Sequence, residues 1–123
     1  MAEFALSHSG VSVYGTTRTR SSIDNIKHIL HEVSLIECDL KDPFSVKDLV
    51  EKTKPDRIFH LAGQSFVPAS WNAPQETLTT NILSELNLFE AVRQAKIPAR
   101  IQIACSSEEY GLVYPEEIYH LLT

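Results

Sequence analysis

Short apolar runs recur along the chain and predict its strands. Each run is rich in Val, Ile, Leu or aromatic residues, which favour strands, and each is followed by polar or turn-forming residues. Gly15-Thr16-Thr17 is expected to close the first run. The four predicted strands lie at residues 11–14, 33–38, 57–61 and 100–105.

The segments between these runs predict helices. Asp42-Pro43 places a capping carboxylate before a proline, and apolar residues then recur at helical spacing until Lys54-Pro55. A longer helical stripe predicts a second helix over residues 74–95. We also expect the tail of a helix at residues 2–6, a weak helix at 23–30 and a loop at 62–72.

Strands that alternate with helices favour an α/β fold, with a parallel sheet that helices cover on both faces. A doubly wound fold of this kind normally begins with a strand at the centre of its sheet, and a glycine-rich phosphate loop follows that strand. Here the first element is a helix, and Gly10, Gly15, Gly63 and Gly111 never approach the spacing of such a loop. The fold is therefore expected to lack its first strand and its glycine-rich loop.

Composition narrows the class of protein. The 123 residues are 43% hydrophobic and 22% charged, with a formal net charge of -5, as in ordinary globular domains. No apolar run approaches the length of a membrane span, and no basic cluster suits nucleic acid, so we expect a cytoplasmic protein that binds neither membranes nor nucleic acid. Cys38 and Cys105 each end an apolar run and are expected to be buried thiols.

Cationic and hydroxyl side chains follow the first strand. Arg18, Arg20 and Ser21 are suited to holding a phosphate ester, because one guanidinium group can donate two parallel hydrogen bonds to the oxygens of a phosphate. In doubly wound folds this position contacts the ribose of a dinucleotide, and an arginine there accommodates the 2′-phosphate of NADP. The alternative is a solvated polar turn.

The next two strands also end in candidate ligand contacts. Asp39-Leu40 follows the second strand, and Asp39 is expected either to accept a hydrogen bond from an adenine amino group or to cap a turn. After the third strand come Leu61, Ala62, Gly63, Gln64 and Ser65, whose small residues allow a cofactor to approach the backbone. A plain tight turn is the competing interpretation.

The fourth strand leads into the segment with the most candidate catalytic side chains. Ser106 and Ser107 precede Glu108, which gives two hydroxyl donors beside a carboxylate suited to acid/base work. No metal site is expected, because His28 and His31 have no further ligand at a recognisable spacing.

Taken in order, these motifs resemble the extended short-chain dehydrogenase/reductases that act on GDP-sugars. The resemblance covers about residues 11–117. Gln64-Ser65 and the Arg18/Arg20 turn are similar to GDP-mannose 4,6-dehydratase, whereas residues 106–110 and Ser70-Trp71 are equally similar to GDP-4-keto-6-deoxymannose reductase. The motifs are residues 13–18, Asp39-Leu40, residues 55–65 and residues 106–111.

The resemblance implies a partial Rossmann fold, NADP as cofactor, a GDP-sugar as substrate, and a homo-oligomeric parent enzyme with lyase activity. In the dehydratase, Ser106 donates to the sugar 4-oxygen, Glu108 removes the C5 proton, and Ser107 lies near the departing 6-hydroxyl. In the reductase, Ser106 assists hydride delivery to the 4-keto group. The implied cofactor contacts are Arg18, Arg20, Ser21, Asp39, Leu40 and residues 61–65.

The chain also departs from the family pattern. None of its four tyrosines is followed by lysine at the fourth position, although the family uses a Tyr-x-x-x-Lys pair. We therefore expect residues 1–123 to form a partial NAD(P)-binding domain without the sugar-nucleotide domain, inactive alone, from a truncated or frame-shifted reading frame. A non-catalytic nucleotide-binding module is the alternative function.

Overall fold

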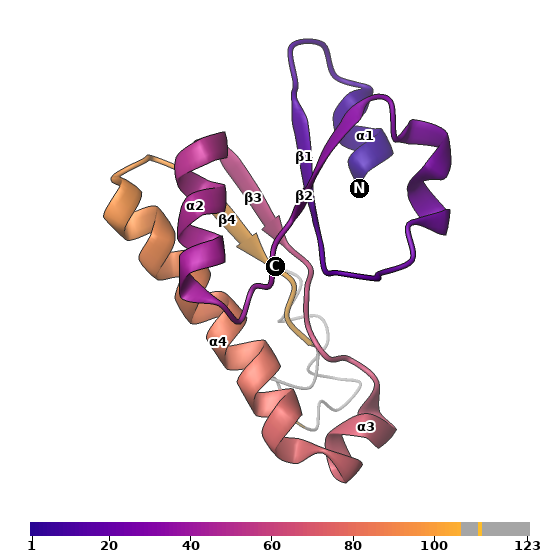
Figure 1. The fold of residues 1–123 in the computed structure, drawn as a ribbon, viewed down its shortest axis with the longest axis vertical. Helices are drawn as coiled ribbons and strands as arrows, with labels where there is room; N and C mark the ends of the chain where they lie inside the picture. The colour runs from indigo at the N-terminus through magenta and orange to yellow at the C-terminus, as the bar shows by residue number, and fades with distance from the viewer. Residues whose placement is uncertain (107–110, 112–123) are drawn as a thin grey trace, which may run out of the picture.

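The computed structural model describes residues 1–106 and 111. Helices and strands alternate along most of this length (Figure 1). In chain order the elements are α1 (Ala2–Leu6), β1 (Val13–Thr17), a 3₁₀ helix (Asp24–Ile29), β2 (Val33–Glu37), α2 (Pro43–Thr53), β3 (Arg57–His60), α3 (Val67–Asn72), α4 (Pro74–Ala95) and β4 (Arg100–Ile103).

The four strands form two parallel pairs. In the β1–β2 pair Val13 lies opposite Val33, and in the β3–β4 pair Arg57 lies opposite Arg100. In the described part of the chain β1 and β3 are not hydrogen-bonded to each other. In the doubly wound order 3-2-1-4-5, the first strand separates the second from the fourth. The two pairs correspond to the two sides of such a sheet.

Helices cover the two strand pairs unequally. Helices α2 and α4 lie side by side along β3 and β4, while α1 and the 3₁₀ helix lie beside β1 and β2 (Figure 1). Ile58 and Ile101 point toward α2 and α4, whereas Phe59 on the opposite face of β3 is 48% exposed. Helices α2 and α4 therefore share one face of β3–β4 in the described part of the chain, because side chains alternate between the two faces of a strand.

The hydrophobic core lies between α2, α4 and the adjoining strands. Val46 and Val50 on α2 meet Leu88 and Ala91 on α4, and Cys38 joins the same cluster from the end of β2. Helix α2 follows the prediction closely: the Asp42 carboxylate accepts hydrogen bonds from the Phe44 and Ser45 amides, and Lys54 ends the helix in a left-handed conformation. Capping and core packing therefore fix the N-terminus of α2 beside the end of β2.

Three local predictions differ in detail from the structure. Gly15-Thr16-Thr17, expected to close the first strand, belongs to β1. A Cβ at Gly15 would lie 2.9 Å from the end of the Leu35 side chain, so glycine lets β1 lie close to that side chain of β2. Residues 67–72 form α3 within the predicted loop, since proline suits a first helical turn. Residues 24–29 form a 3₁₀ rather than an α-helix.

The two cysteines differ in burial. Cys38 is buried as predicted, whereas Cys105 is exposed, which corrects the expectation for that residue. Cys105 lies beyond Ile103, the last residue of β4, where the chain has left the sheet. Burial raises the pKa of the Cys38 thiol, with smaller contributions from Asp39 and Asp42.

His60 couples the stability of this core to pH. Its ring is 6% exposed and lies 3.3 Å from the Ser84 hydroxyl, and burial lowers its pKa below the ordinary value of 6.5, although Glu85 opposes the shift. The unfolded state therefore binds more protons between the lowered pKa and 6.5, so the free energy of unfolding falls as pH drops through that window.

We expect urea denaturation to show lower stability at about pH 5.5 than at about pH 7.5. His60→Gln should remove most of this difference, while His31→Gln, at an exposed position, should retain it. A pH dependence unchanged in His60→Gln would assign the effect to other groups.

Candidate functional site

A tight turn follows β1 at the edge of the sheet where ligands bind in α/β folds. The Ser21 amide donates to the Arg18 carbonyl at 3.0 Å, and Arg20 adopts a left-handed conformation with φ of 64°. The turn places Arg18 and Thr19 on the side of β2, where the Thr19 hydroxyl donates to the Glu37 carboxylate. The sequence-predicted Arg18, Arg20 and Ser21 thus share one turn but occupy different parts of it.

A pocket of about 370 Å³ opens between this turn and the end of β2. It brings together Arg18 and Asp39, which were expected to follow two different strands. Arg20 and Ser21 are absent from its lining. The described residues that line the pocket are Arg18, Thr19, Glu37, Cys38, Asp39 and Ser45.

Hydrogen bonds within the loop after β2, and one from α4, hold that loop in place. The Asp39 carboxylate accepts from the Lys41 amide at 3.0 Å, and its carbonyl accepts from the Asp42 amide at 3.0 Å. The Leu40 carbonyl accepts from the Asn87 side chain on α4 at 2.9 Å. The Leu40 side chain packs against the hydrophobic core.

The N-terminus of α2 borders the same pocket through Ser45. The Ser45 hydroxyl and amide both donate to the Asp42 carboxylate, at 2.5 and 3.1 Å, and these bonds lower the Asp42 pKa. Asp42 is thereby kept ionised as the helix cap. Ser45 is fixed at the pocket by the same bonds that begin the helix.

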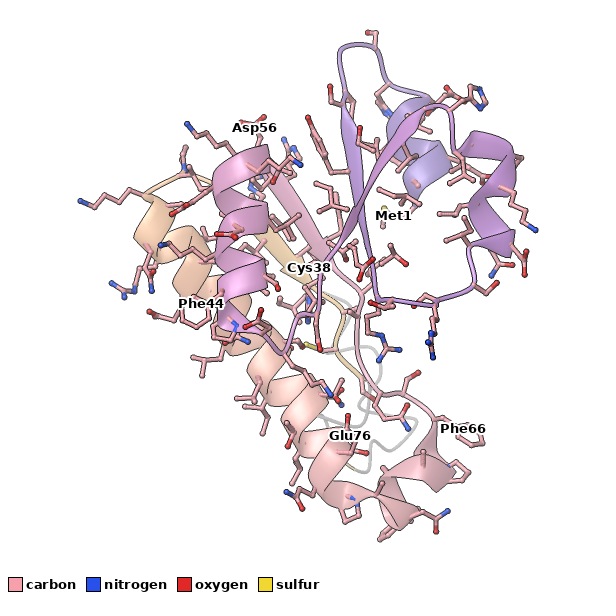
Figure 2. The ribbon with its side chains drawn as sticks, viewed as in Figure 1. Met1, Cys38, Phe44, Asp56, Phe66 and Glu76 are labelled. Atoms are coloured by element: carbon pink, nitrogen blue, oxygen red, sulfur yellow. The ribbon has the colours of Figure 1, made fainter. Side chains whose placement is uncertain are left out.

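An ion pair joins this loop to α4. The Lys41 ammonium donates to the Glu76 carboxylate at 2.9 Å, and each group shifts the pKa of the other toward its charged form. The Arg18 charge reaches both: it opposes the rise in the Lys41 pKa and contributes to the fall in the Glu76 pKa. Figure 2 shows Glu76 near the start of α4 and Cys38 at the end of β2, on either side of this region.

The segment after β3 forms a second, separate feature. Asn81 on α4 holds Gln64 through two hydrogen bonds: its side-chain oxygen accepts from the Gln64 amide at 2.7 Å, and its nitrogen donates to the Gln64 carbonyl at 3.3 Å. Gly63 lies against the same side chain, which a Cβ would approach to 3.4 Å. Leu61, Ala62 and Ser65 are exposed, so the backbone of this predicted cofactor segment is open to a ligand.

The remaining predicted residues fall at the end of the described structure. Ser106 is exposed beyond β4, while Ser107 and Glu108 lie outside the described residues. Within residues 1–106 and 111, no three His, Cys, Asp or Glu side chains gather as a metal site. His28 instead pairs with Glu3, and His31 lies 3.4 Å from Glu32.

Sequence analysis missed the residues that act across elements. Glu37 and Ser45 reach the pocket from β2 and α2, and Asn81 reaches Gln64 across 17 positions. Asn81 gave no distinguishing signal, because it stands among other polar residues of the helix, after Thr79 and Thr80. The Lys41–Glu76 pair had no signal, because 35 residues separate its members.

None of the helices in the described part of the chain has both the length and the apolarity needed to cross a membrane.

The fold and the site together define a class of protein. A structure of RMD from Pseudomonas aeruginosa complexed with NADPH is similar with a TM-score of 0.64 and 27% identity, covering 88% of this chain and 40% of that one. The structural relatives are Rossmann-fold epimerases and dehydratases, which confirms the predicted partial Rossmann fold. The chain is thus a Rossmann-type region.

The family follows from the sequence comparisons. The model of the GDP-mannose 4,6 dehydratase family matches residues 1–120, and the chain belongs to that family. A GDP-mannose 4,6-dehydratase from Yersinia enterocolitica is 37% identical over 92% of this chain and 33% of its own length. A GDP-6-deoxy-D-mannose reductase from Pseudomonas aeruginosa is 37% identical over 61% of this chain and 24% of its own length.

The expected resemblance to this family is confirmed. The chain spans about a third of the length of the curated dehydratases that it matches.

Proposed function

We propose that the chain is the cofactor-binding part of an NADP-dependent GDP-mannose 4,6-dehydratase and that the pocket beside β1 and β2 holds the adenosine 2′-phosphate. The single observation that carries this proposal is the meeting of Arg18, Thr19 and Asp39 in one pocket. The NADPH bound to the similar Pseudomonas structure supports the same cofactor.

The lining residues fit such a group chemically. The Arg18 guanidinium can donate two parallel hydrogen bonds to a phosphate. The Thr19 hydroxyl, whose one proton is donated to Glu37 in the structure, would have to turn from that carboxylate to donate to the phosphate. The Asp39 carboxylate can accept from the adenine amino group, since its oxygens have further acceptor capacity beyond the bond from Lys41. The exposed backbone at Gly63 to Ser65, which Asn81 anchors at Gln64, offers amides to a more distant part of the dinucleotide.

A bound nicotinamide supplies the hydride chemistry of the family. In this proposal Ser106 donates to the sugar 4-oxygen, Glu108 takes the C5 proton, and Ser107 lies near the 6-hydroxyl of a GDP-sugar. We expect these 123 residues to provide only part of the catalytic apparatus, because they contain no Tyr-x-x-x-Lys pair. The reductase is the second candidate for the whole enzyme, supported by the similarity to the Pseudomonas GDP-6-deoxy-D-mannose reductase.

Calorimetric titration with two matched ligands tests the cofactor proposal. The chain should bind adenosine 2′,5′-bisphosphate more tightly than adenosine 5′-monophosphate, which differs only in lacking the 2′-phosphate. Arg18→Met should weaken the bisphosphate by about 10- to 100-fold, the range for a charge-assisted hydrogen bond, and barely change the monophosphate.

Arg57→Met is the matched control, because Arg57 begins β3 at the amino end of the strand, opposite the edge that carries the site. Equal affinity of the wild-type chain for the two ligands would contradict NADP specificity.

A further inference from the structure

The pocket proposed for the 2′-phosphate has an unfavourable charge balance by itself. Its described lining contains one cation, Arg18, and two carboxylates, Glu37 and Asp39. A phosphate monoester carries between one and two negative charges near neutral pH. A single arginine beside two carboxylates therefore leaves the occupied pocket with excess negative charge.

Lys41 is placed to supply the missing charge. Its amide donates to the Asp39 carboxylate, and the carbonyl of the preceding residue is bound by Asn87, so the backbone at the base of the side chain is fixed. The side chain is 32% exposed and can rotate about four carbon–carbon bonds from this fixed base. It stands two residues from Asp39, which lines the pocket.

In the structure this ammonium is bound to Glu76 rather than turned to the pocket. The two partners differ in exposure. The Glu76 side chain is 63% exposed, against 32% for Lys41, so the Glu76 carboxylate loses little hydration in the ion pair and is readily solvated without it. Thr80 also donates to the Glu76 carboxylate at 3.2 Å, which leaves it a partner without Lys41. Arg18 opposes the rise in the Lys41 pKa and contributes to the fall in the Glu76 pKa, so its charge acts on both partners.

Resting on the proposed function, we propose that Lys41 is the second phosphate-binding cation of this pocket and that Glu76 holds it away from an anionic ligand. The ion pair then sets how strongly the site prefers a 2′-phosphorylated adenosine. Glu76 is a positioning residue, because it acts on the ligand through Lys41 and through its charge.

The two partners have opposite expected effects. Glu76→Gln frees the ammonium and removes a repulsive carboxylate, and both changes favour a phosphate. Lys41→Met removes the cation and leaves Glu76 negative, and both changes disfavour it. A purely structural role for the ion pair would instead make the two substitutions act in the same direction.

The experiment is calorimetric titration of the full 123-residue chain with adenosine 2′,5′-bisphosphate and adenosine 5′-monophosphate. We expect Glu76→Gln to tighten bisphosphate binding by about 3- to 10-fold and Lys41→Met to weaken it by about 10-fold, while monophosphate binding changes less than twofold. Both effects should shrink at high salt. The double variant should lie between the two single variants.

Two control variants change the same charges elsewhere. Glu90→Gln also removes a carboxylate of an α4 ion pair, with Arg93, and Lys47→Met also removes a lysine paired with a carboxylate, Glu51 on α2. Neither residue lines the pocket, so both controls should match the wild-type chain. An effect of Glu76→Gln no larger than that of Glu90→Gln would overturn the inference.

The inference and the proposed function fail in different ways. Arg18-dependent bisphosphate binding that neither Lys41→Met nor Glu76→Gln alters would overturn the inference and leave the proposed function intact. No 2′-phosphate preference in either the wild-type chain or Glu76→Gln would overturn both.

Discussion

Leu88→Ala is expected to lower the free energy of unfolding by about 3 kcal/mol, within the range for truncation of a buried leucine. Leu88 is 4% exposed and lies in the cluster that joins α4 to Val46 and Val50 on α2. Truncation removes apolar contacts and leaves a cavity between the two helices. Because domains of this size are only marginally stable, such a loss is a large part of the total.

Leu86 provides a control on the same helix. Its side chain is 51% exposed, so Leu86→Ala removes the same atoms from a position without a closed core. Urea denaturation followed by circular dichroism at neutral pH should show a much smaller loss for Leu86→Ala than for Leu88→Ala. Equal losses would mean that the α2–α4 cluster is not the part of the core that limits stability.

Elements fixed by local chemistry were predictable from the sequence. Helix α2 begins at Pro43 after an Asp42 cap, and α4 extends over its whole predicted range, because capping groups and helical apolar spacing lie within a few residues of each other. The separation of the sheet into two pairs was not predicted. It depends on which strands pair, and strand pairing is a contact between distant segments.

In the candidate site, too, some residues were predictable from the local sequence and others depend on contacts between distant elements. Arg18, Asp39 and the segment at Gly63 were predicted because each follows a strand, and parallel strands end at one edge of a sheet. The inclusion of Glu37 and Ser45 in the pocket depends on a side-chain register between β2 and α2. The Lys41–Glu76 pair depends on the angle at which α4 approaches the loop, which no local pattern encodes.

Asn81 shows how one side chain of α4 can organise a loop that sequence analysis treated as an isolated motif. Its amide occupies both the donor and the acceptor of the Gln64 backbone, at 2.7 and 3.3 Å. It also lies 3.4 Å from the position of a Cβ on Gly63, so the same side chain packs directly against that glycine. The predicted cofactor segment after β3 therefore depends on α4 for its conformation.

Asn81→Leu is accordingly expected to lower the free energy of unfolding by about 2 kcal/mol, because a side chain of similar size leaves the Gln64 amide and carbonyl without their partners. Amide hydrogen exchange should become faster at Gln64, while the core at Val50 keeps its protection relative to global unfolding. Asn87→Leu is the matched control, since the Asn87 side chain binds the Leu40 carbonyl rather than Gln64 and its loss should leave exchange at Gln64 unchanged. Unaltered exchange at Gln64 in Asn81→Leu would show that the loop is held by other contacts.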